Sequence, residues 1–194
     1  MTERAMDMDA RWIRSRFPAL DKDWILFDNA GGSVPLGSVI ERVADYMASC
    51  PVQLGASYRP SEEAVARLDA SRQALAQMVG AAGDELVFGA STTSLICRLA
   101  RAMAEKLQPG DEIIVTEVDH EANISPWRRL ESQGVRIRTW PLNRDSQALE
   151  QDDLLPLLGD KTRLVCVTHA SNILGEVVAV EDVANAVHAV GGLL

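Results

Sequence analysis

From Glu85 onward, short apolar segments alternate with stretches of helical periodicity, and this alternation constrains the fold more than any other feature. The β-prone segments are ELVFGA, EIIVTEV, VRIRTW and RLVCVTHA, at residues 85–90, 112–118, 135–140 and 163–170. Helices are predicted between and after them, near residues 92–107, 123–133, 152–158 and 181–190. Strands that alternate with helices predict an α/β fold with a mostly parallel sheet and flanking helices.

The sequence before Glu85 predicts an N-terminal arm followed by two helices. Residues 1–23 are charged and partly helical in pattern, so we expect them to form the arm, and residues 24–194 the domain itself. WILFDNA (24–30) is typical of a short strand that enters the turn GGSVP. One helix is expected from Leu36 to Ser49, and a second begins near Pro60 with Ser61 as its predicted cap.

The net charge of −9 and the pI near 4.8 argue against nucleic acid and anionic membranes as partners. No apolar segment approaches the length that spans a membrane. Cys50, Cys97 and Cys166 are odd in number and far apart, which favours neither a disulfide framework nor a zinc site. We therefore expect a cytoplasmic protein whose partner is a small molecule.

Polar residues cluster where three of the predicted strands end. Because ligands of open parallel sheets bind beyond the carboxyl ends of the strands, these residues are expected to converge at one edge. They lie in GASTT, EVDHEAN and THASN and are Thr92, Thr93, His120, Asn123, His169 and Asn172.

The turn GASTT and His120 also have purely structural interpretations. Ser91, Thr92 and Thr93 could serve only to cap a helix, or their turn could bind a lone phosphate group, since helix N-termini attract anions. The sequence contains neither GxGxxG nor GxxxxGK[ST], so no nucleotide-binding motif supports a larger ligand. His120 could be a histidine hydrogen-bonded at a strand end, and the spacing of the three histidines does not support a metal site.

Four segments in the same chain resemble one known family. FDNAGGSVP, FGASTTSLICRLA, DEIIVTEVDHEANISPW and TRLVCVTHASNILGEV, in this order and spacing, are similar to the N-terminal half of class-V aminotransferases, in particular the cysteine desulfurase-like branch. The resemblance runs from about Phe17 to Leu194. It implies the large domain of fold-type I enzymes, with pyridoxal 5′-phosphate (PLP) as cofactor, an amino acid as substrate and a homodimer as the complete protein.

The resemblance also implies roles for particular residues. The turn Ser91-Thr92-Thr93 would bind the cofactor phosphate through backbone N–H groups and a hydroxyl. His120 would stack on the pyridine ring and assist proton transfer, and Asn172 would lie near the 3-oxygen of the ring.

Two further residues of the family pattern have no match. The family's aspartate at the pyridine nitrogen and the lysine that binds the cofactor covalently both follow the strand that GGLL begins. Lys22, Lys106 and Lys161 match neither position. We therefore expect a large domain truncated at its C-terminus that does not turn over by itself. The alternatives are a complete, non-catalytic α/β domain that binds phosphate or another small molecule, and a degenerate product without a stable fold.

The resemblance further implies the order of the strands. In the family's order, the strand at 112–118 lies between those at 135–140 and 163–170, and GGLL opens the next strand outward. The segment ELVFGA would have no neighbour within this chain. We therefore expect it to be detached or paired abnormally, and the isolated chain to be marginally stable or prone to aggregate.

Overall fold

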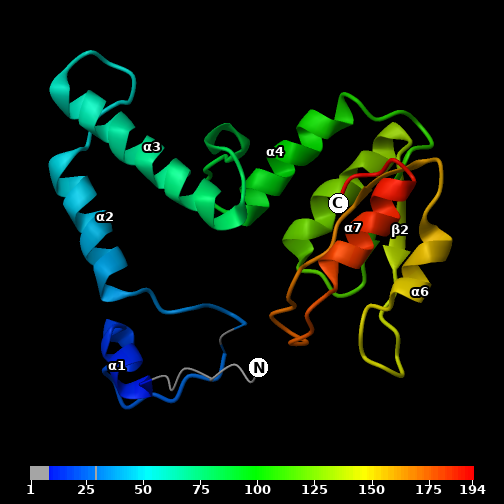
Figure 1. The fold of residues 1–194 in the computed structure, drawn as a ribbon, viewed down its shortest axis with the longest axis horizontal. Helices are drawn as coiled ribbons and strands as arrows, with labels where there is room; N and C mark the ends of the chain where they lie inside the picture. Colours follow the sequence, from blue (N-terminus) through cyan, green and yellow to red (C-terminus); the bar gives the residue numbers. More distant parts are fainter. Residues whose placement is uncertain (1–8, 29) are drawn as a thin grey trace, which may run out of the picture. The chain divides into compact units, whose positions relative to one another are not determined.

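The computed structural model describes residues 9–28 and 30–194, which form two compact units that divide between Val87 and Phe88. Each unit is described by itself. This division differs from the arm expected at residues 1–23, which stays a prediction. Figure 1 shows the helices and strands along the chain.

The described part of the first unit consists of helices and connecting loops. Its elements are α1 (Ala10–Ser15), the 3-10 turn η1 (Pro18–Leu20), α2 (Gly37–Ser49), α3 (Arg59–Val79) and the 3-10 turn η2 (Gly83–Glu85). The carboxylate of Asp9 begins α1 by accepting hydrogen bonds from the N–H groups of Arg11 and Trp12. Gly80 ends α3 in the left-handed conformation (φ 67°) that glycine adopts most readily.

The helix expected near Pro60 forms, but Ser61 does not cap it. α3 begins at Arg59, and the fully buried Ser61 lies within its first turn. Its hydroxyl donates to the carbonyl oxygen of Gln53 (2.8 Å) and accepts from the N–H of Ala56 (3.0 Å). The prediction was wrong because Ser61 binds the preceding loop instead of the free N–H groups of its own helix.

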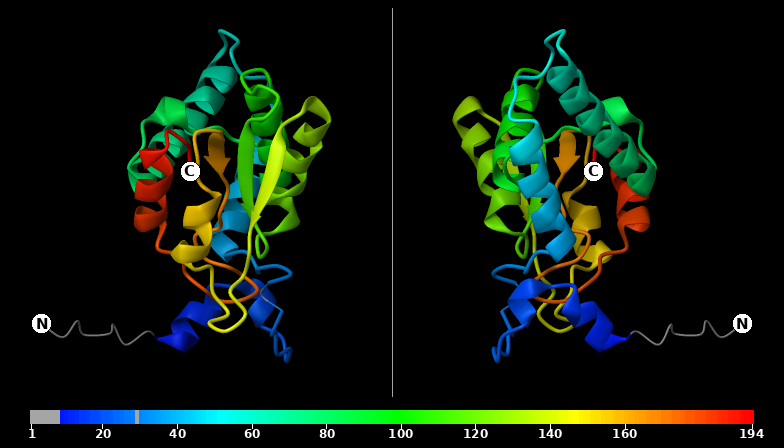
Figure 2. Two further views of the ribbon diagram at one scale, coloured as in Figure 1. Left: turned by 90° about the vertical axis from the view of Figure 1, so that its right-hand side faces the viewer. Right: turned by 90° about the vertical axis from the view of Figure 1, so that its left-hand side faces the viewer.

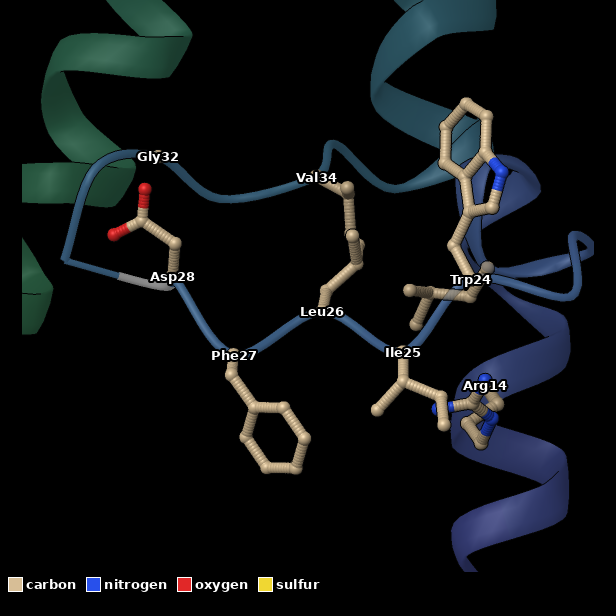
Figure 3. A pocket seen from close by; sticks show the side chains of 9 residues that line it. Arg14, Trp24, Ile25, Leu26, Phe27, Asp28, Gly32 and Val34 are labelled. Atoms are coloured by element: carbon tan, nitrogen blue, oxygen red, sulfur yellow. The ribbon is translucent and has the colours of Figure 1, made fainter.

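The strand expected at WILFDNA does not form in residues 24–28, and Asn29 lies outside the described residues. Residues 24–28 are extended, with Ile25 and Phe27 on one side and Leu26 on the other (Figure 3). Ile25 is 81% exposed and Phe27 is 92% exposed. A strand requires a hydrogen-bonded neighbour, and the described part of this unit supplies none.

The second unit contains a parallel sheet of three strands, β1 (Glu112–Thr116), β2 (Arg136–Trp140) and β3 (Thr162–Val165). Their order is β2-β1-β3, as the family's strand order implied. Leu193 then pairs in parallel with Leu164, and its carbonyl oxygen accepts from the N–H of Val165 at 2.8 Å. GGLL therefore lies beside β3, the position in the sheet that the family's strand order implied.

Helices cover both faces of this sheet. The helices are α4 (Thr92–Ala104), α5 (Ser125–Arg128), α6 (Gln151–Leu154) and α7 (Val180–Ala189), with 3-10 turns η3 (Glu121–Asn123), η4 (Arg129–Gln133) and η5 (Leu155–Leu157). Ile113 and Val115 pack on one face with Trp127 of α5, whereas Ile114 packs on the other with Val187 of α7. Figure 2 shows the strands between α7 (red) and the helical turns α5 and η4 (yellow-green). This arrangement confirms the α/β fold with flanking helices.

The strand expected at ELVFGA is absent. η2 takes Gly83–Glu85, and residues 86–90 form neither a strand nor part of the described three-stranded sheet. The side chain of Val87 is 70% exposed. The prediction of a strand was wrong, and the prediction that this segment would lie detached from the sheet is confirmed. The apolar pattern alone cannot hold a strand in place without a neighbour.

Candidate active site

The turn before α4 is shaped by two serines that cap each other. Ser91 Oγ accepts from the N–H of Ser94 and Ser94 Oγ accepts from the N–H of Ser91, both at 3.2 Å. Ser94 Oγ also donates to the carbonyl oxygen of Ser91 at 2.9 Å. The capping interpretation of Ser91 is therefore correct, and it fixes the direction in which the helix begins.

The capping leaves two backbone donors at the tip of α4. The N–H groups of Thr92 and Thr93 have no hydrogen-bond partner among the described residues, and both residues are exposed. Gly89 lies so close to the helix that a Cβ there would meet Leu95 at 2.5 Å. Free N–H groups at the positive end of a 13-residue helix can receive a phosphate dianion.

His120 lies in the loop that follows β1 and begins the turn η3. Its Nδ1 accepts a hydrogen bond from the N–H of Ala122 at 3.0 Å. In the neutral ring the proton is therefore on Nε2. The residue is exposed, so the ring can meet a ligand and Nε2 can donate or exchange a proton there.

Asn172 lies at the tip of a hairpin that follows β3. Ala170 and Val177 pair in antiparallel fashion, and the hydroxyl of Ser171 accepts from the N–H of Leu174 at 3.1 Å. Gly175 closes the turn with φ 73°, a conformation that a residue with a side chain rarely adopts. This tight turn exposes Asn172 at the end of a defined loop.

The loops of His120 and Asn172 are joined by Asp119, a residue that the sequence patterns did not single out. Its Oδ2 accepts from the N–H of Thr168, which follows β3, at 3.0 Å. The same oxygen accepts from the hydroxyl of Thr116, the last residue of β1, at 3.1 Å. The spacing Thr116-x-x-Asp119 is a local turn signal. The hydrogen bond to Thr168 spans 49 positions, so no local sequence pattern predicts it.

Asn123 and His169, two further predicted members of the site, each make a structural hydrogen bond through the backbone. Asn123 donates its backbone N–H to the carbonyl oxygen of His120 at 2.8 Å, and His169 accepts from the N–H of Val178 through its own carbonyl oxygen at 2.8 Å. Among residues 9–28 and 30–194, no three His, Cys, Asp or Glu side chains are grouped so that they could hold a metal ion. In the same residues, no helix is both long and apolar enough to cross a membrane.

The positions of the lysines in the second unit agree with the expectation from the sequence. Lys161 immediately precedes β3, and its carbonyl oxygen accepts from the N–H of Glu112 at the start of β1. It therefore lies at the amino edge of the sheet, whereas His120 and Asn172 follow the carboxyl ends. Lys106 follows the C-terminal end of α4, and Thr92 and Thr93 begin that helix.

Cys166 is buried directly after β3, and we expect it to be chemically inert. Burial raises the pKa of its thiol to about 12, and the negative charge of Asp119 adds to this rise. At pH 8 only about one such thiol in ten thousand is ionised, and the thiolate is the reactive form. Maleimide should therefore modify the half-buried Cys97 at least about tenfold faster than Cys166, as measured by peptide mass spectrometry. Equal rates would contradict the burial of Cys166.

Comparison with known proteins identifies the family. The sequence pattern described as Aminotransferase class-V matches residues 25–194. The chain belongs to the class-V aminotransferase family. The match covers both the loop of His120 and the turn that begins α4.

Among the class-V aminotransferase relatives, the chain is 45% identical to the aminotransferase-like protein FGM3 of Gibberella zeae over 94% of its length. It is 34% identical to the cysteine desulfurase-like protein ustD of Aspergillus flavus over 96% of its length. The apo structure of the cysteine desulfurase from Thermococcus onnurineus NA1 matches 94% of the chain with a TM-score of 0.85 and 25% identity.

The chain spans about half the length of these relatives, covering 46% of the Gibberella protein, 44% of the Aspergillus protein and 46% of the Thermococcus structure. The fold of the chain is that of the fold-type I enzymes to which the cysteine desulfurases belong.

Proposed function

We propose that this chain provides the phosphate-binding turn and the ring-facing residues of a PLP-dependent enzyme that acts on an amino acid. Enzymes of this family depend on PLP. The observation that carries the proposal is the tip of α4, where the N–H groups of Thr92 and Thr93 have no partner among the described residues. A phosphate dianion at this position would satisfy both donors and interact favourably with the helix dipole.

The proposed roles follow from the donors and acceptors that each residue presents. Ser91, Thr92 and Thr93 hold the phosphate, His120 lies against the ring and exchanges a proton through Nε2, and the side-chain amide of Asn172 donates to the 3-oxygen. Bound PLP supplies an electron sink for bonds at the α-carbon of the amino acid. We further propose a homodimer in the cytoplasm, with cysteine desulfuration or transamination as the candidate reactions.

The lysine and the aspartate that PLP chemistry requires are not among the proposed site residues of this chain. We therefore expect the 194 residues by themselves not to turn over. A full-length protein that carries this chain should bind PLP and develop the absorbance of a protein-bound cofactor when PLP is titrated. An unchanged spectrum at saturating PLP would refute the proposal and favour a domain without catalytic function.

The phosphate site can be tested at Thr93. In the full-length protein, Thr93→Val should weaken PLP binding by about 1–3 kcal/mol, because one hydrogen bond to a charged group is lost. Thr93→Ser retains the hydroxyl and is the matched control, with an affinity close to that of the unmodified protein. Equal affinities for the valine and serine variants in a fluorescence titration would show that the hydroxyl does not contact the phosphate.

The role of His120 can be tested by its spectrum and rate. His120→Ala should shift the absorbance of bound PLP and lower turnover, because the ring loses its stacking partner and a proton carrier. His188→Ala is the matched control, since His188 is an exposed histidine near the end of α7. If the spectrum and the rate survive in both variants, the role of His120 is only to cap η3.

A further inference from the structure

Thr116 and Asp119 form a closed turn at the end of the central strand β1. The hydroxyl of Thr116 accepts from the N–H of Asp119 at 2.9 Å and from the N–H of Val118 at 3.3 Å. The same hydroxyl uses its proton to donate to Asp119 Oδ2 at 3.1 Å. Thr116 is 1% exposed and belongs to a strand with both faces covered, so the turn rests on a rigid part of the sheet.

Asp119 extends this turn to the neighbouring strand. Its Oδ2 also accepts from the N–H of Thr168, at 3.0 Å, three residues after β3 has ended. The next residue, His169, accepts from the N–H of Val178 and so begins the hairpin that carries Asn172. One carboxylate oxygen therefore links the residue before His120 to the base of the Asn172 hairpin.

We propose that Asp119 is a positioning residue that fixes the His120 loop and the Asn172 hairpin relative to each other, so that both can contact the cofactor ring. This inference rests on the proposed PLP function, because both loops are proposed to contact that ring. Asp119 acts through the two loops and needs no contact with the cofactor. A carboxylate oxygen is a stronger acceptor than a neutral one, which suits the hydrogen bond from the N–H of Thr168 to this role.

The side chain of Asp119 fits this role for steric and chemical reasons. Its single methylene places Oδ2 within reach of both the Thr116 hydroxyl and the Thr168 N–H. Asparagine retains one carbonyl oxygen as an acceptor but loses the charge, so it should preserve part of the link. Alanine removes the acceptor and leaves the N–H of Thr168 without this partner.

The first test measures the link without the cofactor. In the full-length protein without PLP, Asp119→Ala should raise the amide exchange rate of Thr168 at least about tenfold while that of Ile114 in β1 stays unchanged, as followed by NMR. Thr116→Val should produce a smaller rise, and Thr116→Ser, which keeps the hydroxyl, should match the unmodified protein. An unchanged Thr168 amide in Asp119→Ala, or in Thr116→Val if the alanine variant does not fold, would overturn the proposal.

The second test measures positioning at the ring. With PLP added, Asp119→Ala should shift the visible circular dichroism of the cofactor and Asp119→Asn should shift it less. Glu117→Gln is the control, because Glu117 lies in the same loop but binds Arg144 and the N–H of Leu142 instead. Faster Thr168 exchange with an unchanged cofactor signal would overturn the positioning role. If the unmodified protein does not bind PLP, the proposed function fails, and the Thr168 amide still decides whether Asp119 links the loops.

Discussion

Trp140→Ala is expected to destabilise the chain by about 3–5 kcal/mol, a large part of the stability that a unit of this size has in total. Trp140 is fully buried at the end of β2 and packs against Leu154 and Val187. Its Nε1 donates to the carbonyl oxygen of Glu150 at 2.9 Å, so the substitution removes packing and also one of the two hydrogen bonds that this half-buried carbonyl accepts, the other coming from the N–H of Asp153. Urea denaturation followed by circular dichroism measures the loss, at concentrations at which the protein is monomeric.

Trp24→Ala is the matched control for this experiment. Trp24 is 66% exposed, and its removal should change the free energy of unfolding by no more than about 0.5 kcal/mol. A similar loss of stability in both variants would mean that the core around Trp140 is not packed as described.

The 194-residue chain, expressed by itself, is expected to associate as its concentration rises. The extended segment Trp24–Asp28 exposes Ile25 and Phe27 on one side, and its backbone has no neighbouring strand among the described residues (Figure 3). Exposed apolar surface and unpaired extended backbone both favour pairing between chains. Size-exclusion chromatography over a range of concentrations should show earlier elution as the concentration increases.

Charged substitutions should identify the segment responsible. Replacing Ile25 and Phe27 with lysine should reduce the association, because it removes the apolar side of the segment and adds positive charges. Replacing the exposed Ser33 and Gln53 with lysine adds the same charge and should leave the association unchanged. A monomer at all concentrations, with a sharp melt and slow amide exchange in residues 85–90, would contradict this prediction. It would show that neither residues 24–28 nor residues 85–90 cause the chain to associate.

The sequence predicted the sheet well where neighbouring strands are present in the chain. EIIVTEV, VRIRTW and RLVCVTHA each form a strand, because each has a partner that completes its hydrogen bonds and a helix that covers its side chains. ELVFGA and WILFDNA have equally apolar patterns and form no strand in the described residues. A local pattern gives the preference for extended structure, but pairing determines whether a strand exists.

The same contrast holds for the candidate site. His120 and Asn172 could be selected from the sequence because polar residues are conspicuous after apolar strands. The role of Asp119 in linking the two loops could not be predicted from the sequence, since its hydrogen bond with the N–H of Thr168 joins residues 49 positions apart. Ser61 was misassigned for a similar reason, because its partners, Gln53 and Ala56, lie in a loop whose path the sequence does not reveal.

The bond between Asp119 and Thr168 also bears on how this protein can diverge. Both ends of the intervening segment are held at the carboxyl edge of the sheet, so changes in the length of its outer loops need not be transmitted to His120 or Asn172. The loop at residues 141–149 is the natural place for such insertions, because Asn143 and Ala148 pair with each other and close it locally. Descendants of this sequence could acquire new surfaces there while the geometry beside the two strand ends is inherited unchanged.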